Sequence, residues 1–265
     1  MTVFWKRAAP KGFEHLRLKL KSLGVDEAVG EKFVSRISCF ADSHRSQDII
    51  TPGTSPNRLT VLMEGVACLY ERLADGTRQI FGFLYAGDFC LNRHLLPTTG
   101  DEVAVEAITK CSVGFIEHRV LEELLAEYPS LGMALWRAHI LEASISRKRL
   151  LNIGRQPALE RVAHLLCEQL ALQEAVGINS AAIPLNQIDI ADASGLSVVH
   201  VNRTFKELQR LGLLVKEGRT MEVADRERLA LLGAFDGNYL NMPQLLSRWQ
   251  INMDRPAPAP KRALS

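Results

Sequence analysis

The chain has 265 residues, of which 47% are hydrophobic and 23% are charged, and its formal net charge at pH 7 is +2. This length suits two domains, each with its own core, and the small net charge confines any nucleic-acid-binding surface to a local patch. No apolar run approaches the ~20 residues of a membrane span, and the N-terminal stretch lacks the apolar centre of a secretory signal. We therefore expect a cytoplasmic protein without a membrane partner.

A helical segment over residues 1–39 is predicted to precede a β-rich domain over residues 40–128. Between about residues 47 and 117, short runs of β-forming residues alternate with glycines, and many short strands separated by turns favour a jelly-roll barrel. Asp75 and Gly76 join two of these runs and indicate a hairpin, because both turn positions tolerate positive φ. The helical segment carries apolar side chains on one face: Phe13, Leu16, Leu20 and Leu23.

Five cysteines are scattered along the chain without a C-x-x-C pair, so we expect no zinc or iron–sulfur site and no cofactor. A free cysteine in a strand is usually a small buried hydrophobe, and redox sensing is the open alternative. A metal-dependent barrel enzyme is a second alternative, but it needs clustered histidines, whereas His44, His94 and His118 are scattered. No nucleophile elbow, phosphate loop or metal-binding helix motif is present. The chain is therefore predicted not to be an enzyme.

Residues 129–153 are predicted to form one long helix of roughly 37 Å, beginning at Pro129, which a first helical turn tolerates well. Its apolar spacing favours pairing with the same helix of a second subunit, and a helix packed only on its own barrel is the alternative. Leu135 and Trp136 are expected to contact the barrel in either case. The predicted dimer seam consists of Leu131, Ala134, Ala138, Leu141 and Ile145.

Residues 154–240 are predicted to form a separate domain around a helix, a tight turn and a second helix. Ala191 supplies the small residue that closely crossing helices need, and Gly195 suits the positive φ of the turn. Ser197 is placed to cap the second helix. The inward face of that helix repeats apolar residues at i, i+4 and i+7: Val201, Phe205 and Leu208. An ordinary helical hairpin with solvated basic residues is the alternative interpretation.

Two strand-like runs, residues 213–215 and 220–223, follow the second helix and predict a β wing. The fold class is therefore α+β: a jelly-roll barrel, a long dimerisation helix and a C-terminal winged helix-turn-helix domain. The tail over residues 241–265 is proline-rich and expected to be partly disordered. The predicted DNA-binding residues are Ser197, Val199, His200, Asn202, Arg203, Lys206 and Arg210, with Arg219 on the wing.

The chain resembles the CRP/FNR family of bacterial transcription regulators from about residue 40 to about residue 235. The resemblance rests on the turn Gly87-Asp88-Phe89, on the long helix that follows, and on the sequence IADASGLSVVHVNRTFKELQRLGLL. It implies a cyclic-nucleotide-binding-like barrel, a dimerisation helix and a winged helix. It also implies a homodimer that binds palindromic promoter sites in double-stranded DNA and contacts RNA polymerase.

Arg203 matches the arginine of the family's recognition helix, which is implied to read guanine O6 and N7 through two hydrogen bonds. Four residues earlier the family often has a glutamate that accepts from cytosine N4. This chain has Val199 there, which offers only apolar contact, for instance with a thymine methyl group. The half-site of the best-known members is therefore not expected. His200 and Asn202 are candidates for further base or phosphate contacts.

The sensor residues depart from those of the family members that bind cyclic AMP. Those members carry a Gly-Glu pair soon after the Gly-Asp-Phe turn and an Arg-Ser pair beyond it, whereas the aligned stretches here read Leu91-Asn92 and Glu102-Val103. A carboxylate near the phosphate position repels a cyclic phosphate, so cyclic AMP is disfavoured and the small-molecule effector stays unknown. Residues 1–38 contain no cysteine, so the iron–sulfur cluster of the oxygen-sensing branch is not expected either.

Two subunits paired along residues 129–153 are expected to present their recognition helices about 34 Å apart, which is one turn of DNA. Lysine and arginine contacts with phosphates would supply a salt-dependent affinity, and Arg203 and its neighbours the sequence preference. A signal sensed in the barrel is expected to act through a hinge near Gly154 by shifting existing populations.

Overall fold

The computed structural model describes residues 10–54, 57–90, 103–217 and 220–241. The chain divides into two compact units, residues 1–146 (the barrel unit) and 147–265 (the helical unit), and the division falls inside the long helix. No helix among the described residues is both long enough and apolar enough to cross a bilayer.

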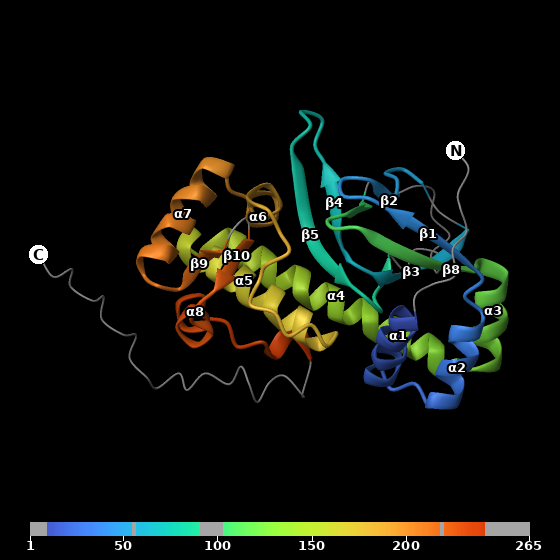
Figure 1. The fold of residues 1–265 in the computed structure, drawn as a ribbon. Coiled ribbons are helices and arrows are strands. Elements are labelled where there is room, and N and C mark those ends of the chain that lie inside the picture. Colours follow the sequence, from blue (N-terminus) through green and yellow to red (C-terminus); the bar gives the residue numbers. More distant parts are fainter. Residues whose placement is uncertain (1–9, 55–56, 91–102, 218–219, 242–265) are drawn as a thin grey trace, which may run out of the picture. The chain divides into compact units, whose positions relative to one another are not determined.

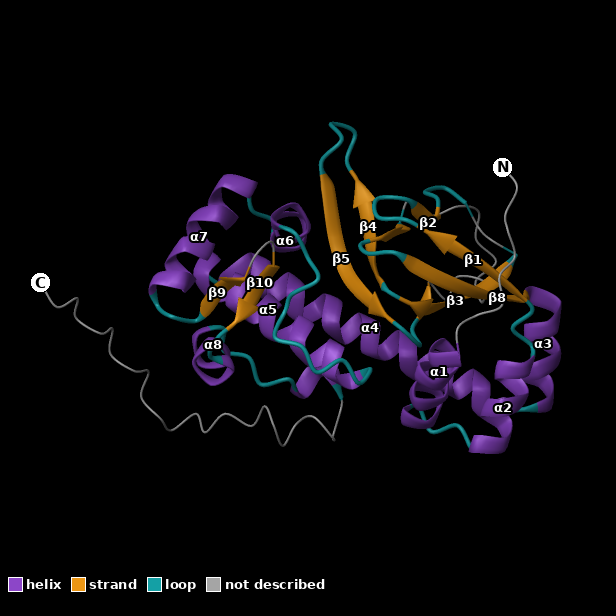
Figure 2. Cartoon of the chain, viewed as in Figure 1, coloured by secondary structure: helices purple, strands orange, loops and turns teal. Residues whose placement is uncertain are grey.

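Two four-stranded antiparallel sheets form the barrel unit, with the strand orders β1-β8-β3-β6 and β2-β7-β4-β5 (Figure 2). Apolar side chains from both sheets form one buried core, to which Leu62, Leu69, Val105 and Phe115 contribute. This arrangement confirms the predicted jelly-roll barrel. The strands are β1 (Cys39–Ser43), β2 (Asp48–Ile50), β3 (Arg58–Glu64), β4 (Val66–Arg72), β5 (Arg78–Tyr85), β6 (Phe89–Cys90), β7 (Ala104–Ala107) and β8 (Cys111–Glu117).

The hairpin between β4 and β5 turns at the predicted residues (Figure 1). Gly76 has φ +86°, whereas Asp75 keeps a negative φ. The side chain of Asp75 accepts a hydrogen bond of 2.8 Å from the backbone N–H of Thr77. The hairpin prediction is therefore confirmed, but only the glycine uses its freedom to adopt positive φ, while the aspartate closes the turn with its side chain.

Four helices belong wholly or partly to the barrel unit: α1 (Pro10–Ser22), α2 (Glu27–Ser35), α3 (His118–Glu127) and α4 (Pro129–Arg155). Helix α1 lies directly on the turn Gly87-Asp88-Phe89. A Cβ atom on Gly87 would lie only 2.8 Å from the carbonyl oxygen of His15, and Gly87 itself has φ +93°. Lys19 pairs with Asp88 at 2.6 Å. Glycine is thus needed at residue 87 both for its backbone conformation and for the close approach of α1.

The helical unit is built around α5 (Ala158–Ala175), which is buried from Val162 to Gln173. Helices α6, α7 and α8 pack against it, and a two-stranded antiparallel sheet follows α7. The predicted winged helix-turn-helix domain is therefore confirmed. The remaining elements are α6 (Gln187–Ser194), α7 (Val198–Arg210), β9 (Leu214–Glu217), β10 (Thr220–Val223), α8 (Arg226–Leu232) and a 3₁₀ turn (Asn238–Leu240).

Candidate nucleic-acid interface

The turn between α6 and α7 has the geometry that its residues predict. Gly195 has φ +62° and ψ +40°, and its N–H donates to the carbonyl oxygen of Ala191. The N–H of Leu196 donates to the same carbonyl oxygen at 3.1 Å. Because Ala191 is buried and lacks a bulky side chain, the two helices can cross closely there. The turn therefore holds α7 at a defined angle to α6.

Both helices begin with a side-chain cap. Asn186 and Asp189 cap α6 reciprocally. The side chain of Asn186 accepts a hydrogen bond of 2.8 Å from the N–H of Asp189, and the side chain of Asp189 accepts one of 3.0 Å from the N–H of Asn186. Ser197 caps α7, as predicted, by accepting a bond of 3.2 Å from the N–H of His200. The serine hydroxyl thus fixes the first turn of α7, and its contact with DNA stays a prediction.

One face of α7 is exposed along its whole length. Val199, Arg203, Lys206 and Arg210 follow one another at intervals of three or four residues, and all four are exposed. His200 is also exposed, next to this stripe. The opposite face is buried and consists of Val201, Thr204, Phe205 and Leu208. The structure therefore brings most of the predicted DNA-binding residues together on one outward surface.

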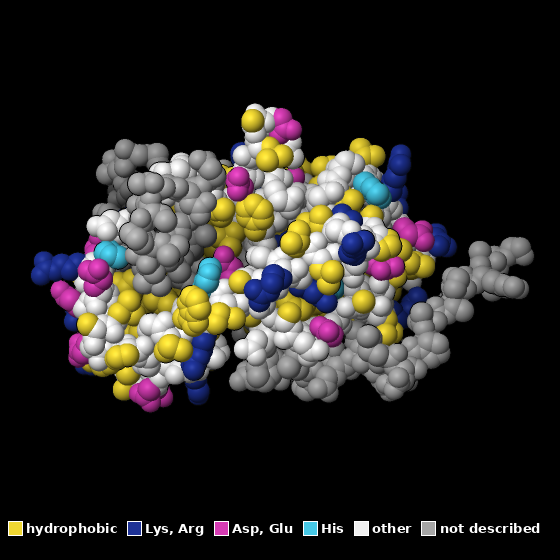
Figure 3. Space-filling model, turned by 180° about the vertical axis from the view of Figure 1, so that it is seen from behind, with side chains coloured by type: hydrophobic (Ala, Val, Ile, Leu, Met, Phe, Trp, Pro, Cys, Tyr) yellow, Lys and Arg dark blue, Asp and Glu magenta, His cyan; other side chains and the backbone are white. Residues whose placement is uncertain are grey.

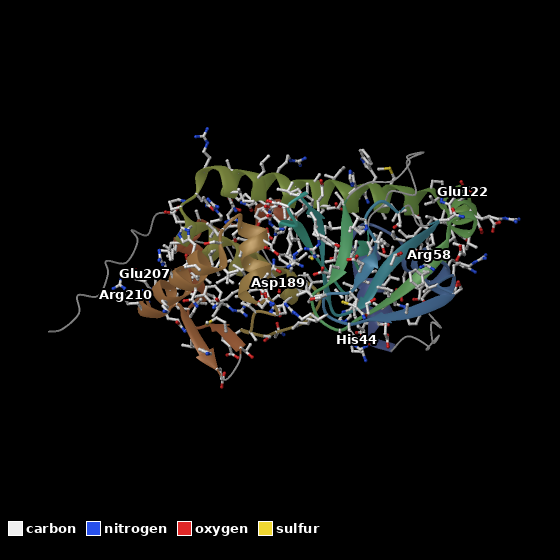
Figure 4. The ribbon with its side chains drawn as sticks, turned by 90° about the horizontal axis from the view of Figure 1, so that it is seen from above. His44, Arg58, Glu122, Asp189, Glu207 and Arg210 are labelled. Carbon is white, nitrogen blue, oxygen red and sulfur yellow. The ribbon has the colours of Figure 1, made fainter. Side chains whose placement is uncertain are left out.

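Two predicted DNA-binding residues already have partners within the protein. Arg210 donates to Glu207 through Nε at 2.9 Å and Nη2 at 2.7 Å, and both side chains lie at the outer surface of α7 (Figure 4). This contact lowers the pKa of the Glu207 carboxyl group. Asn202 donates to Gln187 on α6 at 3.3 Å. Arg210 is thus paired with a carboxylate, which makes it a weaker candidate for phosphate binding than Lys206.

One candidate on α7 is absent from the predicted set. Val198 is 42% exposed at the first position of the helix, next to Val199, which is 63% exposed. Its position directly after the cap is the sequence signal that identifies it, because the first residues of a recognition helix point toward base edges. Arg219 lies outside the described residues, whereas Lys216 on β9 is exposed.

A buried polar network fixes the surroundings of α5. Arg149 on α4 pairs with Glu168 on α5, and Tyr239 donates to the other carboxylate oxygen of Glu168 at 2.7 Å. His164 lies 3.0 Å from the Tyr239 hydroxyl. Burial, followed by the nearby Glu168 carboxylate, raises the pKa of Tyr239 well above its ordinary value. The pattern of apolar residues did not predict this network, because its members are polar residues of α4, α5 and the 3₁₀ turn that meet only in the folded unit.

Arg161 on α5 ties the helix-turn-helix to the end of α4. Its guanidinium donates to the carbonyl oxygen of Ser194 at 2.7 Å and to that of Gln156 at 2.9 Å. Ser194 is the last residue of α6, so a cation there also interacts favourably with the helix dipole. Arg161 was not a predicted site residue, and an arginine within an amphipathic helix carries no distinct signal of this role.

The predicted dimer seam on α4 needs a correction. Leu131 and Ala134 are 1% and 0% exposed in the core of their own barrel unit, and Ala138 packs against that core. Leu131 and Ala134 therefore leave no surface for a partner helix, whereas Ala138 is half-buried and its role stays a prediction. Leu141 and Ile145 are half-buried, and their role stays a prediction. Leu135 is buried as expected, whereas Trp136 is 57% exposed, and its expected contact with the barrel stays a prediction.

Four cysteines have described side chains, and all four are buried. They are Cys68, Cys90, Cys111 and Cys167. Burial raises the pKa of Cys90 and Cys167, and it raises the pKa of Cys111 to about 11. A thiol that stays protonated at neutral pH is a poor redox sensor. The side chain of Cys39 is not described.

The predicted sensor positions lie mostly outside the described residues. These positions are Leu91, Asn92, His94 and Glu102. Within the described part of the chain, no group of three His, Cys, Asp or Glu side chains is arranged to hold a metal ion. His118 instead lies 3.1 Å from the Glu122 carboxylate, one turn along α3.

Two family models match the chain, one for each unit. A cyclic nucleotide-binding domain matches residues 43–128, and a Crp-like helix-turn-helix domain matches residues 160–232. The transcriptional activatory protein AadR of Rhodopseudomonas palustris is 33% identical over 184 residues, which are 65% of this chain and 72% of AadR. The nitrogen fixation regulation protein FixK of Bradyrhizobium diazoefficiens is 32% identical over 181 residues, which are 65% of this chain and 73% of FixK.

A solved structure shows the same order of elements. FixK2 from Bradyrhizobium japonicum superposes with a TM-score of 0.64 and 26% identity, over 73% of this chain and 96% of FixK2. The barrel, the long helix and the winged helix of this chain therefore resemble those of the relatives in sequence and in fold. The chain belongs to the CRP/FNR family of transcription regulators.

Proposed function

We propose that this DNA-binding regulator acts as a homodimer in the cytoplasm and that α7 reads a palindromic promoter site. RNA polymerase is its proposed partner on the promoter. A signal sensed in the barrel unit modulates binding, and cyclic AMP is disfavoured as that signal because of the residues at positions 91, 92 and 102. The protein has no catalytic role in this proposal.

The observation that carries the homodimer is a stripe of exposed apolar residues on α4. Some side chains of α4 point away from the barrel strands in Figure 4, and the face of the molecule drawn in Figure 3 carries patches of hydrophobic side chains. Large apolar side chains that gather on one exposed helix face usually mark an interface. The α4 stripe consists of Met133, Trp136, Ile140 and Leu150, all exposed.

The α4 stripe has the spacing of a coiled-coil seam. Met133 and Ile140 are seven residues apart, Trp136 lies between them, and Leu150 is fourteen residues beyond Trp136. The first three members lie two residues after Leu131, Ala134 and Ala138, which corresponds to a rotation of roughly 200° around the helix. The proposed partner helix therefore contacts the side of α4 opposite to the barrel core.

Pairing through the α4 stripe gives the protein two copies of α7. A C₂ dimer presents the same surface twice, so its DNA site is expected to be an inverted repeat. The exposed side chains of Arg203 and Lys206 then supply base and phosphate contacts in each half-site. Doubling these contacts raises affinity well beyond that of one α7 alone.

The test is Ile140→Glu in the full chain. A carboxylate in the centre of the proposed seam opposes pairing, so we expect half the molar mass of the wild type by light scattering and DNA binding weaker by at least tenfold. Leu73→Glu is the matched control, because Leu73 is also exposed and apolar but lies in the β4–β5 hairpin. An intact Ile140→Glu dimer would contradict the proposed interface.

A further inference from the structure

We infer that Val198 and Val199 read the C5 methyl group of a pyrimidine in the major groove, so that 5-methylcytosine can replace thymine at that base pair. The inference rests on the proposed function, because it requires α7 to enter the groove. It makes the regulator responsive to cytosine methylation within its site.

The first support is the exposure of the two valines, called here the valine pair. Val198 is 42% and Val199 63% exposed, although both are apolar. They occupy the first two positions of α7, directly after the cap residue Ser197. In helix-turn-helix proteins, the N-terminal residues of this helix contact base edges. The valine pair thus lies where the base contacts are made.

The second support is the chemistry of the groove. Of the four bases, only thymine presents a methyl group in the major groove, at C5, beside the hydrogen-bonding groups that every base pair presents there. A valine placed against a polar edge removes water without replacing its hydrogen bonds, which is unfavourable. A valine placed against the methyl group buries two apolar groups together. The valine pair therefore selects a base that carries the methyl group.

The third support is the rigidity of the valine pair. Valine is β-branched and has one strongly preferred rotamer in a helix. The Ser197 hydroxyl fixes the first turn through its bond to His200, and the hydrogen bond from Asn202 to Gln187 ties α7 to α6. These constraints hold the valine methyl groups in one place, as the recognition of a single methyl group requires.

Arg203 locates the methyl group relative to a guanine. Val199 and Arg203 are one helical turn apart on the exposed face, separated by about 6 Å along the axis. The arginine fork binds guanine O6 and N7, so the methyl-bearing pyrimidine lies within one or two base pairs of that guanine. Thymine and 5-methylcytosine carry the same methyl group at C5, and valine has no polar atom that distinguishes O4 from N4.

The experiment uses the full chain and a duplex selected from a random pool. In that duplex, each thymine of both half-sites is replaced in turn by uracil, cytosine or 5-methylcytosine. We expect uracil at one position to weaken binding about fourfold per half-site, because a buried methyl group contributes about that factor. At the same position, 5-methylcytosine should bind more tightly than cytosine. Equal binding of thymine and uracil at every position would overturn the inference.

Variants assign the effect to the valine pair. Val199→Ala should reduce the thymine-to-uracil ratio toward one, and Val199→Glu should reverse the preference from thymine to cytosine, whose N4 donates to a carboxylate. Lys206→Ala is the control, because loss of a phosphate contact should weaken binding to all duplexes equally. An unchanged ratio in Val199→Ala would overturn the role of Val199.

The same experiment separates this inference from the proposed function. If the wild type retains no duplex from the random pool at low salt, the proposed function fails, and the inference fails with it. If the wild type selects an inverted repeat but ignores the methyl group, the proposed function stands and only the inference fails.

Discussion

Helices α4 and α7 both have one buried and one exposed face, but different interactions determine which residues occupy each face. In α7 the buried residues Val201, Phe205 and Leu208 are those that the sequence predicts. In α4 two of the five residues predicted to face a partner, Leu131 and Ala134, lie in the core of the barrel unit. The same kind of apolar pattern thus predicts the buried face of α7, whereas in α4 it assigns two core residues to the partner face.

The difference shows how far local chemistry determines orientation. Gly195 and Ser197, which directly precede α7, determine where α7 begins. The close crossing with α6 at Ala191 then determines which face of α7 packs against the core. Helix α4 has apolar residues on two sides, and only contacts with α1, α2 and the strands decide which side is covered. The buried face of a helix is therefore predictable where a local motif determines it. It is less predictable where contacts with residues distant in sequence decide which of two apolar faces is covered.

The largest expected effect sharpens the contrast between the two faces of α4. Leu131→Ala removes a fully buried side chain, so we expect the barrel unit to lose about 2–5 kcal/mol of unfolding free energy. Ile140→Ala, on the exposed α4 stripe, should instead lower the melting temperature in a way that depends on protein concentration. Chemical denaturation measures the loss of unfolding free energy in Leu131→Ala, and thermal unfolding at two protein concentrations measures the change in melting temperature in Ile140→Ala. Equal behaviour of the two variants would remove the distinction between core and seam.

The next effect concerns the exposed face of α7. Arg203 is exposed, so Arg203→Ala should leave folding stability almost unchanged. Loss of its two hydrogen bonds to guanine should weaken binding to a selected duplex by about 1–3 kcal/mol and relax the preference at one base pair per half-site. Competition binding with single-base variants of the duplex measures the loss of binding free energy and the change in base preference. An unchanged base preference would exclude Arg203 as the reader.

A smaller effect tests the local motif that orients α7. Ser197→Ala removes the bond to the His200 N–H, and we expect a loss of about 1 kcal/mol from the unfolding free energy of the helical unit. Ser197→Asp should restore most of it, since aspartate caps equally well. A full-length protein in which Ser197→Ala is as stable as the wild type would show that tertiary packing, not the cap, fixes the first turn.

The smallest effect is a pH dependence of the helical unit. Burial lowers the pKa of His164 below its ordinary value of about 6.5. The neutral imidazole therefore contributes stability that is fully present above about pH 6.5 and is lost as the pH falls toward the lower pKa of the folded state. We expect the unfolding free energy to decline with acidity over that range, and the decline to be shallower in His164→Gln. Denaturation curves at several pH values measure the two slopes.

Features determined by neighbouring residues were predictable from the sequence. The β4–β5 hairpin follows from Asp75 and Gly76, and the cap of α7 from Ser197. The buried network of Arg149, Glu168 and Tyr239 was not predictable, because it joins three segments through polar atoms whose meeting depends on the whole fold. Val198 was missed for another reason: its position directly after the cap marks it as a candidate, but a valine is usually a buried residue, and its exposure depends on how α7 packs against α5.

The most direct test of the central claim is selection of random duplexes by the full-length protein, followed by sequencing. A homodimer that presents two copies of α7 predicts enrichment of an inverted repeat whose half-sites are about 34 Å apart, one turn of DNA. Each half-site should contain a guanine, and this guanine should no longer be enriched when the selection is repeated with the Arg203→Ala variant. Enrichment of no sequence, or of an asymmetric site, would contradict the account.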